Sequence, residues 1–348
     1  MRYSVQSCLQ EGCEVLILRD EATDSEAAVA AGIGANLFRC RLQGEEWIEP
    51  APNFKTLAQR SSEFGTPLLW PPGRVHRGVF HYDGREYRLP LNEGANHLHG
   101  ELRRLPWNLV NQSASEGQGA TVVLSIHTRR NAQIACYYPH EVELRVTYRL
   151  REGQLTGLLE AVNEGETPAP FGFGLHPYFT VRGEASRWRL RLPVLACYDL
   201  NEHGIAVERP RSHSLCARLQ DGLWLSEWPQ ERAFYVFQCE PGIKRCLLER
   251  LGRSGEEAPV RRVMTLDDAF PYLAIFRPEW AQAVSVEPWS CITDAYQSPL
   301  PPAWTGASGL APGECRTYRW HWQAESLSNE DQRSEQESSG RGSAWNKR

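Results

Sequence analysis

Residues 142–161, "VELRVTYRLREGQLTGLLEA", alternate between apolar and polar side chains in two stretches separated by Glu152 and Gly153. Successive side chains of an extended strand point to opposite faces, so this period of two places the apolar side chains on one face. That face comprises Val142, Leu144, Val146, Tyr148 and Leu150 before the turn, and Leu155, Gly157, Leu159 and Ala161 after it. The pattern predicts a long antiparallel hairpin.

The same signal recurs along the chain. Alternating or short apolar runs that predict strands occur at residues 120–126, 188–194, 233–237, 272–276 and 317–322. Helical periodicity over three turns is hard to find, and 28 Gly with 23 Pro supply turns between the apolar runs. The sequence therefore predicts an all-β fold, a large antiparallel β-sandwich with few short helices.

We expect one folded domain and a tail. No internal repeat and no central linker divides the sequence, and β architectures can reach this size as a single unit. The domain is expected to span residues 1–323. Residues 324–348 are polar and charged with almost nothing to bury, which is the composition of a disordered tail.

Composition excludes several classes of partner. A formal net charge of -5 over 348 residues provides no basic field for nucleic acid. No apolar run reaches the ~20 residues of a membrane span, and the N-terminus lacks the apolar centre of a signal peptide. We therefore expect a cytoplasmic protein with a small-molecule partner. Its 10 cysteines predict reduced, mostly buried thiols, because their spacing is not that of a zinc site.

Two Gly-x-Gly motifs, at residues 32–36 and 172–176, do not indicate a dinucleotide site. Neither opens a helix after a strand within a βαβ unit. Tight turns or close backbone contacts within sheets account for these glycines.

The segment "NHLHG" (96–100) follows a hairpin that Asp83 and Gly84 signal. His97 and His99 are two residues apart, so in a strand they would point to the same face. This spacing can build a metal site, but no carboxylate or cysteine lies at a recognisable ligand distance in the sequence. The alternative is a pair of ordinary loop or surface histidines.

His176 and Glu287 are two further candidates. In "GLHPYF", the proline after His176 restrains the histidine to extended geometry. In "SVEPW", Glu287 follows an apolar strand, where an unpaired charge is costly to bury. Each has a structural alternative: a core histidine bonded to a backbone carbonyl, and a glutamate in a salt bridge.

Taken in order, these segments resemble one family. "AGIGANLFRCRLQG", "GRVHRGVFHYDGREYRL" with "NHLHG", "FGLHPYF" and "SVEPWSCITDAY" together look like the aldose 1-epimerases, or galactose mutarotases. The resemblance covers roughly residues 30–322. It implies a large β-sandwich whose concave face holds a free sugar, with no metal and no organic cofactor.

The resemblance also implies residue roles. His176 is the expected general acid and Glu287 the expected general base. Arg74, Asn96 and His99 are the expected sugar-binding residues. Mutarotation removes the proton of the anomeric hydroxyl and delivers one to the ring oxygen, so acid and base must flank the sugar ring.

Two departures from the family pattern concern specificity. Glu101 follows Gly100 where a second glycine is usual, and we expect its carboxylate beside the sugar. The substrate-binding aspartate of better-known members has no clear counterpart, because Asp267 lies too close to Glu287 in sequence and Asp221 has even less support.

Three functions compete. An isomerase that interconverts the anomers of a free aldohexose, of galactose or glucose type, ranks first because acid and base occupy matching motif positions. A hexose-phosphate mutarotase would need a cationic pocket. A non-catalytic sugar-binding protein could use the same sandwich, since fold alone does not give activity.

Overall fold

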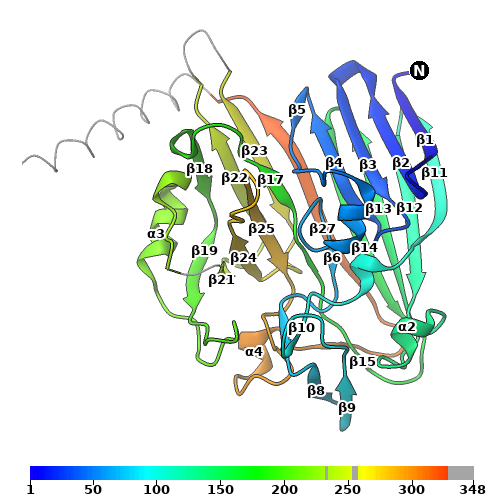
Figure 1. Cartoon of the computed structure of the whole chain (residues 1–348), viewed down its shortest axis with the longest axis vertical. Coiled ribbons are helices and arrows are strands. Elements are labelled where there is room, and N and C mark those ends of the chain that lie inside the picture. The colour runs from blue at the N-terminus through cyan, green and yellow to red at the C-terminus, as the bar shows by residue number, and fades with distance from the viewer. Residues whose placement is uncertain (232–233, 253–257, 328–348) are drawn as a thin grey trace, which may run out of the picture.

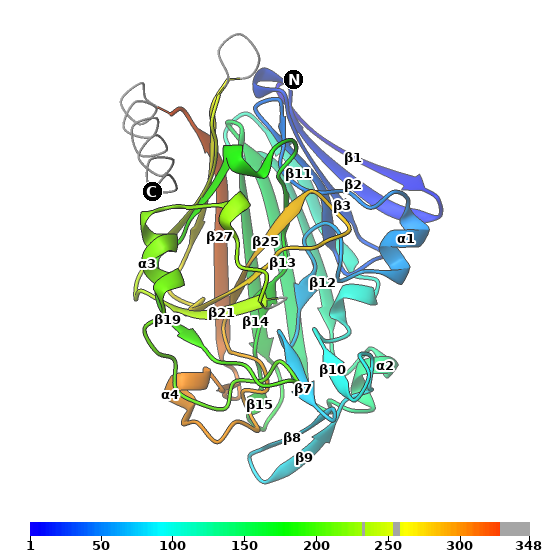
Figure 2. The ribbon, with the colours of Figure 1, turned by 60° about the vertical axis from the view of Figure 1, so that its left-hand side comes forward.

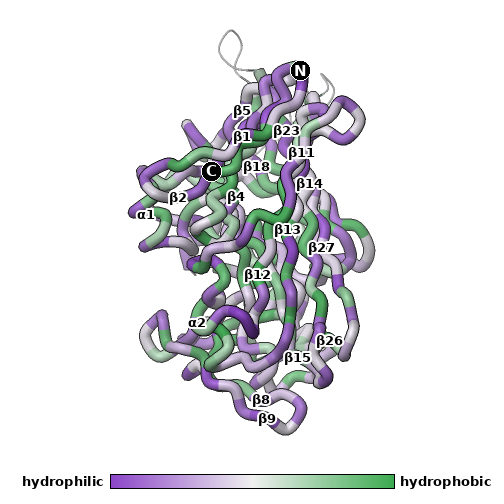
Figure 3. Tube along the Cα trace, turned by 90° about the vertical axis from the view of Figure 1, so that its right-hand side faces the viewer, coloured by the Kyte–Doolittle hydropathy of each residue, from purple (hydrophilic) through white to green (hydrophobic). Residues whose placement is uncertain are grey.

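The predicted hairpin forms the middle of the largest sheet in the computed structural model, which describes residues 1–231, 234–252 and 258–327. Its strands, β13 (Val142–Arg151) and β14 (Gln154–Asn163), pair antiparallel over their whole length. Along β13 every second residue is buried, as predicted. Figure 3 shows the resulting interleaving of hydrophilic and hydrophobic positions along the strands of this sheet.

Nine strands make up this sheet, in the order β11-β12-β13-β14-β27-β23-β22-β18-β20 (Figure 1). Besides β13 and β14 they are β11 (Asn108–Ser115), β12 (Gly119–His127), β27 (Cys315–Glu325), β23 (Val260–Leu266), β22 (Lys244–Arg250), β18 (Trp188–Arg191) and β20 (Leu223–Trp224). The last long strand, β27, pairs with both β14 and β23 and so joins the two halves of the sheet.

Two further sheets lie against the nine-stranded sheet (Figure 2). One has the order β1-β2-β3-β4-β5 and comprises β1 (Tyr3–Gln10), β2 (Cys13–Asp20), β3 (Ser25–Ala30), β4 (Asn36–Leu42) and β5 (Glu45–Glu46). The other has the order β19-β21-β24-β25-β16-β6, with β17 paired to β25; its strands are β19 (Val194–Tyr198), β21 (Phe234–Cys239), β24 (Tyr272–Phe276), β25 (Ala283–Trp289), β16 (Gly174–Leu175), β6 (Leu68–Leu69) and β17 (Tyr178–Thr180).

The remaining elements are short. Three two-stranded ladders comprise β7 (Arg74–His76) with β10 (Asn96–Leu98), β8 (Val79–Tyr82) with β9 (Arg85–Arg88), and β15 (Ala169–Pro170) with β26 (Gly309–Leu310). The α-helices are α1 (Phe54–Gln59), α2 (Ala132–Ala135), α3 (Ser214–Asp221) and α4 (Pro302–Thr305). Within the described part of the chain, no helix has the length and apolar character needed to cross a membrane.

One core joins the layers. Buried side chains of the three large sheets belong to a single apolar cluster. The Tyr148 hydroxyl of β13 donates a 3.0 Å hydrogen bond to the carbonyl of Ala35, and Trp47 stacks on Trp322 of β27 with ring centroids 6.1 Å apart. Each ladder between the named strands of the described residues is antiparallel, so the predicted fold class is confirmed. All 10 cysteines are thiols and most are buried.

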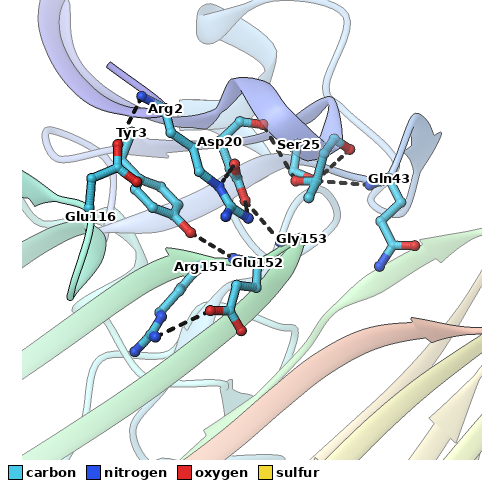
Figure 4. Close-up of polar contacts among 10 residues, drawn as sticks. Arg2, Tyr3, Asp20, Ser25, Gln43, Glu116, Arg151, Glu152 and Gly153 are labelled. Atoms are coloured by element: carbon cyan, nitrogen blue, oxygen red, sulfur yellow. Dashed lines mark hydrogen bonds and ion pairs between the residues drawn. The ribbon is translucent and has the colours of Figure 1, made fainter.

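Polar contacts fasten β2 to the turn of the central hairpin (Figure 4). The buried carboxylate of Asp20 accepts hydrogen bonds from Arg2 Nε at 2.8 Å and from the backbone N–H of Gly153 at 3.1 Å. The backbone N–H of Glu152 donates to the Tyr3 hydroxyl at 3.2 Å. Burial alone would raise the pKa of Asp20. The hydrogen bonds that its carboxylate accepts, including those from Arg2 and Gly153, outweigh burial, so the pKa of Asp20 is lowered. The charged form is therefore stable at this junction.

The end of the chain is only partly described. β27 continues to Glu325, which lies two residues past the expected domain boundary at residue 323. From residue 328 on, the predicted tail (324–348) lies outside the described residues.

Candidate active site

Alternation along β25 places Glu287 on the face of the sheet that lines a cavity. Val284 and Val286 pack into the main core, so Ser285 and Glu287 point to the opposite face. β25 is an inner strand paired with β24 and with β16 and β17, which fixes its backbone on both sides. Glu287 is buried, with 2% of its surface exposed.

His176 lies between β16 and β17, directly beside this carboxylate. Its backbone N–H donates to the carbonyl of Pro67 at 3.0 Å, and its ring stacks on Tyr178 with centroids 4.5 Å apart and planes 11° from parallel. Nε2 of His176 is 3.3 Å from Oε1 of Glu287. The structure thus brings the two expected catalytic groups into contact.

His99 completes the cluster, with its ring centroid 5.2 Å from that of His176. It follows β10 and has a left-handed backbone with φ of +63°. Its Nδ1 accepts a 3.2 Å hydrogen bond from the backbone N–H of Gly73. His97 turns away and bonds the Pro90 carbonyl through Nδ1 at 2.6 Å. The expectation that both histidines share a face is wrong, because the left-handed residue ends the extended geometry.

A cavity of about 250 Å³ lies over the three residues. Its volume is just below the range of about 300–1,000 Å³ that small-molecule sites commonly occupy, which suits a small ligand. Phe276, Trp280 and Trp289 supply flat apolar walls, and Trp280 is exposed at the rim. The lining residues are Ser62, Glu63, Gly73, Arg74, Glu93, Leu98, His99, His176, Tyr178, Phe234, Phe276, Trp280, Glu287 and Trp289.

Arg74, an expected sugar ligand, lines this cavity in a bidentate ion pair. Its Nε is 2.7 Å from Oε2 of Glu93 and its Nη2 is 2.5 Å from Oε1. Phe234 lies under the guanidinium, 5.0 Å from ring centroid to Cζ. The same three residues border a second hollow of about 600 Å³, so the ion pair stands between two adjoining spaces.

Asn96 lines the second hollow rather than the cavity beside His176. Its Oδ1 is 3.3 Å from Nδ1 of His76. Its predicted sugar contact would therefore require a ligand that reaches past Arg74 and Glu93. That role remains a prediction.

The other acidic candidates point elsewhere. Glu101 accepts a 2.8 Å hydrogen bond from Asn92 and does not line the cavity, so the expectation of a carboxylate beside the sugar is wrong. Asp267 accepts hydrogen bonds from the backbone N–H groups of Ala269 and Arg319 in the large sheet. Asp221 ends α3 and is likewise not a lining residue.

Burial shifts the acid–base properties of the pair in opposite directions. It lowers the pKa of His176 to about 3 and raises the pKa of Glu287 well above its ordinary value, with the Trp289 indole and Arg74 only partly opposing the second shift. The pKa of His99 is also well below its usual range, because burial and the neighbouring His176 and Arg103 disfavour its cation. Both shifts favour the uncharged forms, so a proton shared by the pair is favoured on the carboxyl over the imidazole.

These directions predict an unusual pH profile. The singly protonated pair persists from the lowered pKa of His176 up to the raised pKa of Glu287. We expect kcat/KM, which reports the free enzyme, to show no acid limb near the ordinary histidine pKa of ~6.5. It should fall on the acid side only toward about pH 3, and on the alkaline side as Glu287 loses its proton. Initial rates at low sugar concentration across pH test this, and an acid limb centred near 6.5 would contradict it.

His99, His176 and Glu287 each offer a possible metal ligand atom, and these atoms lie within 4.8 Å of one another. However, Nδ1 of His99 accepts the Gly73 N–H, so the neutral ring carries its proton on Nε2. A metal on either ring nitrogen of His99 would break this hydrogen bond. The hydrogen bonding fits a neutral donor to a ligand oxygen better than it fits a metal ligand.

Three residues of the candidate site are absent from the sequence prediction. Tyr178 is two residues after His176 and Ser285 is two before Glu287, and both touch the His176 ring nitrogens. The period of two that identified the strands could have identified these two neighbours. Glu93 had no such signal, because its partner Arg74 belongs to a separate segment.

The large antiparallel β-sandwich is the fold of the galactose mutarotase-like proteins. A sequence profile of the family described as Aldose 1-epimerase matches residues 17–223, which is more than half of the chain. The chain belongs to this family, and the resemblance seen in its motifs is confirmed.

Curated relatives match over part of their length. The uncharacterized protein YihR of Escherichia coli (strain K12) is 30% identical over 189 residues, which cover 52% of this chain and 56% of that protein. The galactose mutarotase of Homo sapiens is 26% identical over 150 residues, which cover 43% of this chain and 38% of that protein. The chain thus matches about half or less of the length of these relatives.

Solved structures share the whole fold. A galactose mutarotase-like protein from Clostridium acetobutylicum superimposes with a TM-score of 0.83 at 17% identity, covering 94% of this chain and 99% of that one. A galactose 1-epimerase from Lactobacillus acidophilus NCFM gives a TM-score of 0.73 at 18% identity, covering 92% and 99%.

Proposed function

We propose that this protein is an aldose 1-epimerase that interconverts the α and β anomers of a free aldohexose of galactose or glucose type. The observation that carries the proposal is the contact between His176 and Glu287 at the wall of a small cavity. The anomeric oxygen O1 and the ring oxygen O5 are both bonded to C1. Groups that exchange protons with these two oxygens can therefore lie side by side, as this pair does.

The pair can run the reaction with one proton. As the sugar binds, the proton passes from Glu287 to Nε2 of His176 across their contact. Glu287 then takes the proton of O1 while His176 gives its proton to O5, the C1–O5 bond breaks, and C1 becomes an aldehyde carbon. After rotation about C1–C2, O5 attacks the other face of the aldehyde and both proton transfers reverse. The enzyme returns to its starting protonation.

Unpaired groups beside the cavity fit a hydroxyl ligand. Oε2 of Glu287 and the indole Nε1 of Trp289 are both buried, and although the indole is close enough to oppose the raised pKa of Glu287, neither atom makes a well-formed hydrogen bond with the described residues. A buried polar group without a partner costs about 1–3 kcal/mol. A sugar hydroxyl can donate to the carboxyl oxygen and accept from the indole, and Nε2–H of His99 offers a further donor.

The charge balance favours a neutral sugar over a hexose phosphate. Arg74 is the sole arginine or lysine among the lining residues, and Glu93 neutralises it. Glu63 and Glu287 add carboxyl groups, while burial keeps His99 and His176 neutral. Among the residues that the structure describes around this cavity, a phosphate dianion would find no uncompensated cation. We also infer that the protein acts in the cytoplasm, which its 10 unbridged thiols support.

Polarimetry tests the proposed activity directly. Freshly dissolved α-galactose and α-glucose should lose their excess optical rotation faster with the wild-type protein than in buffer. A non-catalytic sugar-binding protein would instead rise in melting temperature with sugar and leave the optical decay unchanged. The His176→Asn variant should lose the acceleration, because it removes the proton carrier at Nε2.

Glu93→Gln is predicted to relax the discrimination against anionic sugars. Removal of the carboxylate leaves Arg74 free to bind a phosphate, so kcat/KM for glucose 6-phosphate relative to glucose should rise by about tenfold, which corresponds to ~1.4 kcal/mol. Glu202→Gln is the matched control, because Glu202 lines the second hollow and is exposed without pairing to Arg74. An unchanged ratio in Glu93→Gln would mean that the ion pair does not set this preference.

A further inference from the structure

A buried serine lies behind the ring of His176, on the side away from Glu287. Oγ of Ser285 is 2.7 Å from Nδ1 of His176 and 2.9 Å from the carbonyl oxygen of Pro177. Ser285 is fully buried, and it is paired in register with Tyr178 across β25 and β17. The backbone therefore holds this hydroxyl at a fixed position relative to the imidazole.

Only one arrangement of protons satisfies both contacts. The Pro177 carbonyl can accept but not donate, so the Ser285 hydroxyl must give its single proton to that oxygen. Otherwise two oxygens with only lone pairs would face each other at 2.9 Å. The serine then presents a lone pair to His176, and Nδ1 must carry the proton that fills the 2.7 Å contact.

The same reasoning applies at the other ring nitrogen. The Tyr178 hydroxyl donates to the carbonyl of Ser62 at 2.7 Å, so it can only accept from Nε2 of His176, 3.2 Å away. Oε1 of Glu287 lies 3.3 Å from the same nitrogen. With Nδ1 protonated, Nε2 of the neutral ring has a lone pair for the Glu287 proton. Once Nε2 takes that proton, both oxygens act as its acceptors.

We infer that Ser285 is a positioning residue that, together with the Pro177 carbonyl, holds His176 as the Nδ1–H tautomer and makes Nε2 its only proton-exchanging atom. This inference rests on the proposed function for its kinetic consequence, though not for the tautomer itself. Tyr178 acts at the next step instead: its oxygen can accept a hydrogen bond from Nε2 only after Nε2 takes the Glu287 proton, so it stabilises the doubly protonated ring and not the neutral Nδ1–H tautomer. Without the serine, the neutral ring could carry its proton on Nε2. The Nε2–H group would then face the O–H group of the protonated Glu287 carboxyl, so that two donors would meet.

Nitrogen-15 NMR of the histidine side chains tests the tautomer without any assay of activity. In the wild-type protein near neutral pH, Nδ1 of His176 should give the shift of a protonated ring nitrogen and Nε2 that of an unprotonated one. His176→Asn assigns the signals. In Ser285→Ala the two signals should move toward each other as both tautomers become populated. A wild-type signal showing Nε2–H with unprotonated Nδ1 would overturn the inference.

Kinetics test the consequence. Ser285→Ala should lower kcat by about 10- to 100-fold with KM changed less than threefold, and Ser285→Thr, which keeps the hydroxyl, should recover most of the loss. Ser290→Ala is the matched control, because Ser290, directly after β25, accepts a hydrogen bond at Oγ from the backbone N–H of Phe173 and has no hydrogen bond to His176 in the described part of the chain. Equal losses of kcat in the Ser290→Ala and Ser285→Ala variants would overturn the positioning role.

The two experiments separate the inference from the proposed function. If the wild-type protein has no mutarotase activity but shows the Nδ1–H signal, the proposed function fails and the tautomer assignment stands. If the protein is active and Ser285→Ala keeps both full activity and the Nδ1–H signal, the function stands and the role of Ser285 fails.

Discussion

Glu287→Gln is expected to lower kcat for mutarotation by about 10²–10⁴-fold, the range for loss of one positioned proton-transfer group. The amide has nearly the same shape as the carboxyl and can still donate to Nε2 of His176. It cannot take the proton of O1, so ring opening loses its base. KM should change much less, because the proposed sugar contacts of His99, Arg74 and Trp289 are left in place. Polarimetric initial rates over a range of sugar concentrations separate the two parameters.

The same variant should fold at least as well as the wild type. Burial raises the pKa of Glu287 above its unfolded value, so folding takes up a proton at any pH between the two, and stability falls as pH rises through that window. Glutamine removes this penalty. The free energy of unfolding of the Glu287→Gln variant at neutral pH should therefore equal or exceed that of the wild type. Glu202→Gln, at an exposed position near the site, controls for loss of one carboxylate. Near-normal kcat in Glu287→Gln would refute the assigned base.

Much of the fold follows from the alternation of side chains alone. The central hairpin was predicted to within one residue at its turn, and the runs at 120–126, 272–276 and 317–322 all lie within strands of the structure. The order of the strands in the sheets could not be predicted from this alternation. β27, at the end of the chain, lies between β14 and β23, and this pairing depends on tertiary packing, which side-chain periodicity does not report.

The site was predicted less completely, for a different physical reason. His176 and Glu287 lie in short motifs that identify them as candidates from the sequence. Their contact, however, depends on how β25 pairs with its neighbours. The direction of His99 depends on one left-handed backbone conformation, which residue type alone does not predict for histidine. The neutralisation of Arg74 depends on Glu93 from another segment, and no local pattern connects the two.

The backbone beside His99 can be tested through Gly100→Ala, which we expect to lower the free energy of unfolding by roughly 2–5 kcal/mol. Gly100 has φ of +68°, and a Cβ at this position would lie 1.8 Å from the carbonyl oxygen of Trp70. The left-handed conformation alone costs a residue with a Cβ about 1–2 kcal/mol, and overpacking adds about 1–3 kcal/mol. Any shift that relieves the overlap also moves His99, so KM for the sugar should rise.

Gly84→Ala is the control that separates the two contributions. Gly84 has a similar φ of +72° in the β8–β9 turn, but a Cβ there would meet nothing within 4 Å. Gly84→Ala should therefore lower the free energy of unfolding only by the ~1–2 kcal/mol of backbone strain, and it should leave KM unchanged. Urea unfolding followed by tryptophan fluorescence, with KM from polarimetry, measures both variants. Equal destabilisation of the Gly100→Ala and Gly84→Ala variants would show that the Trp70 carbonyl can move away from an added Cβ. The close approach of the backbone at Gly100 to Trp70 would then not be what holds His99 in place.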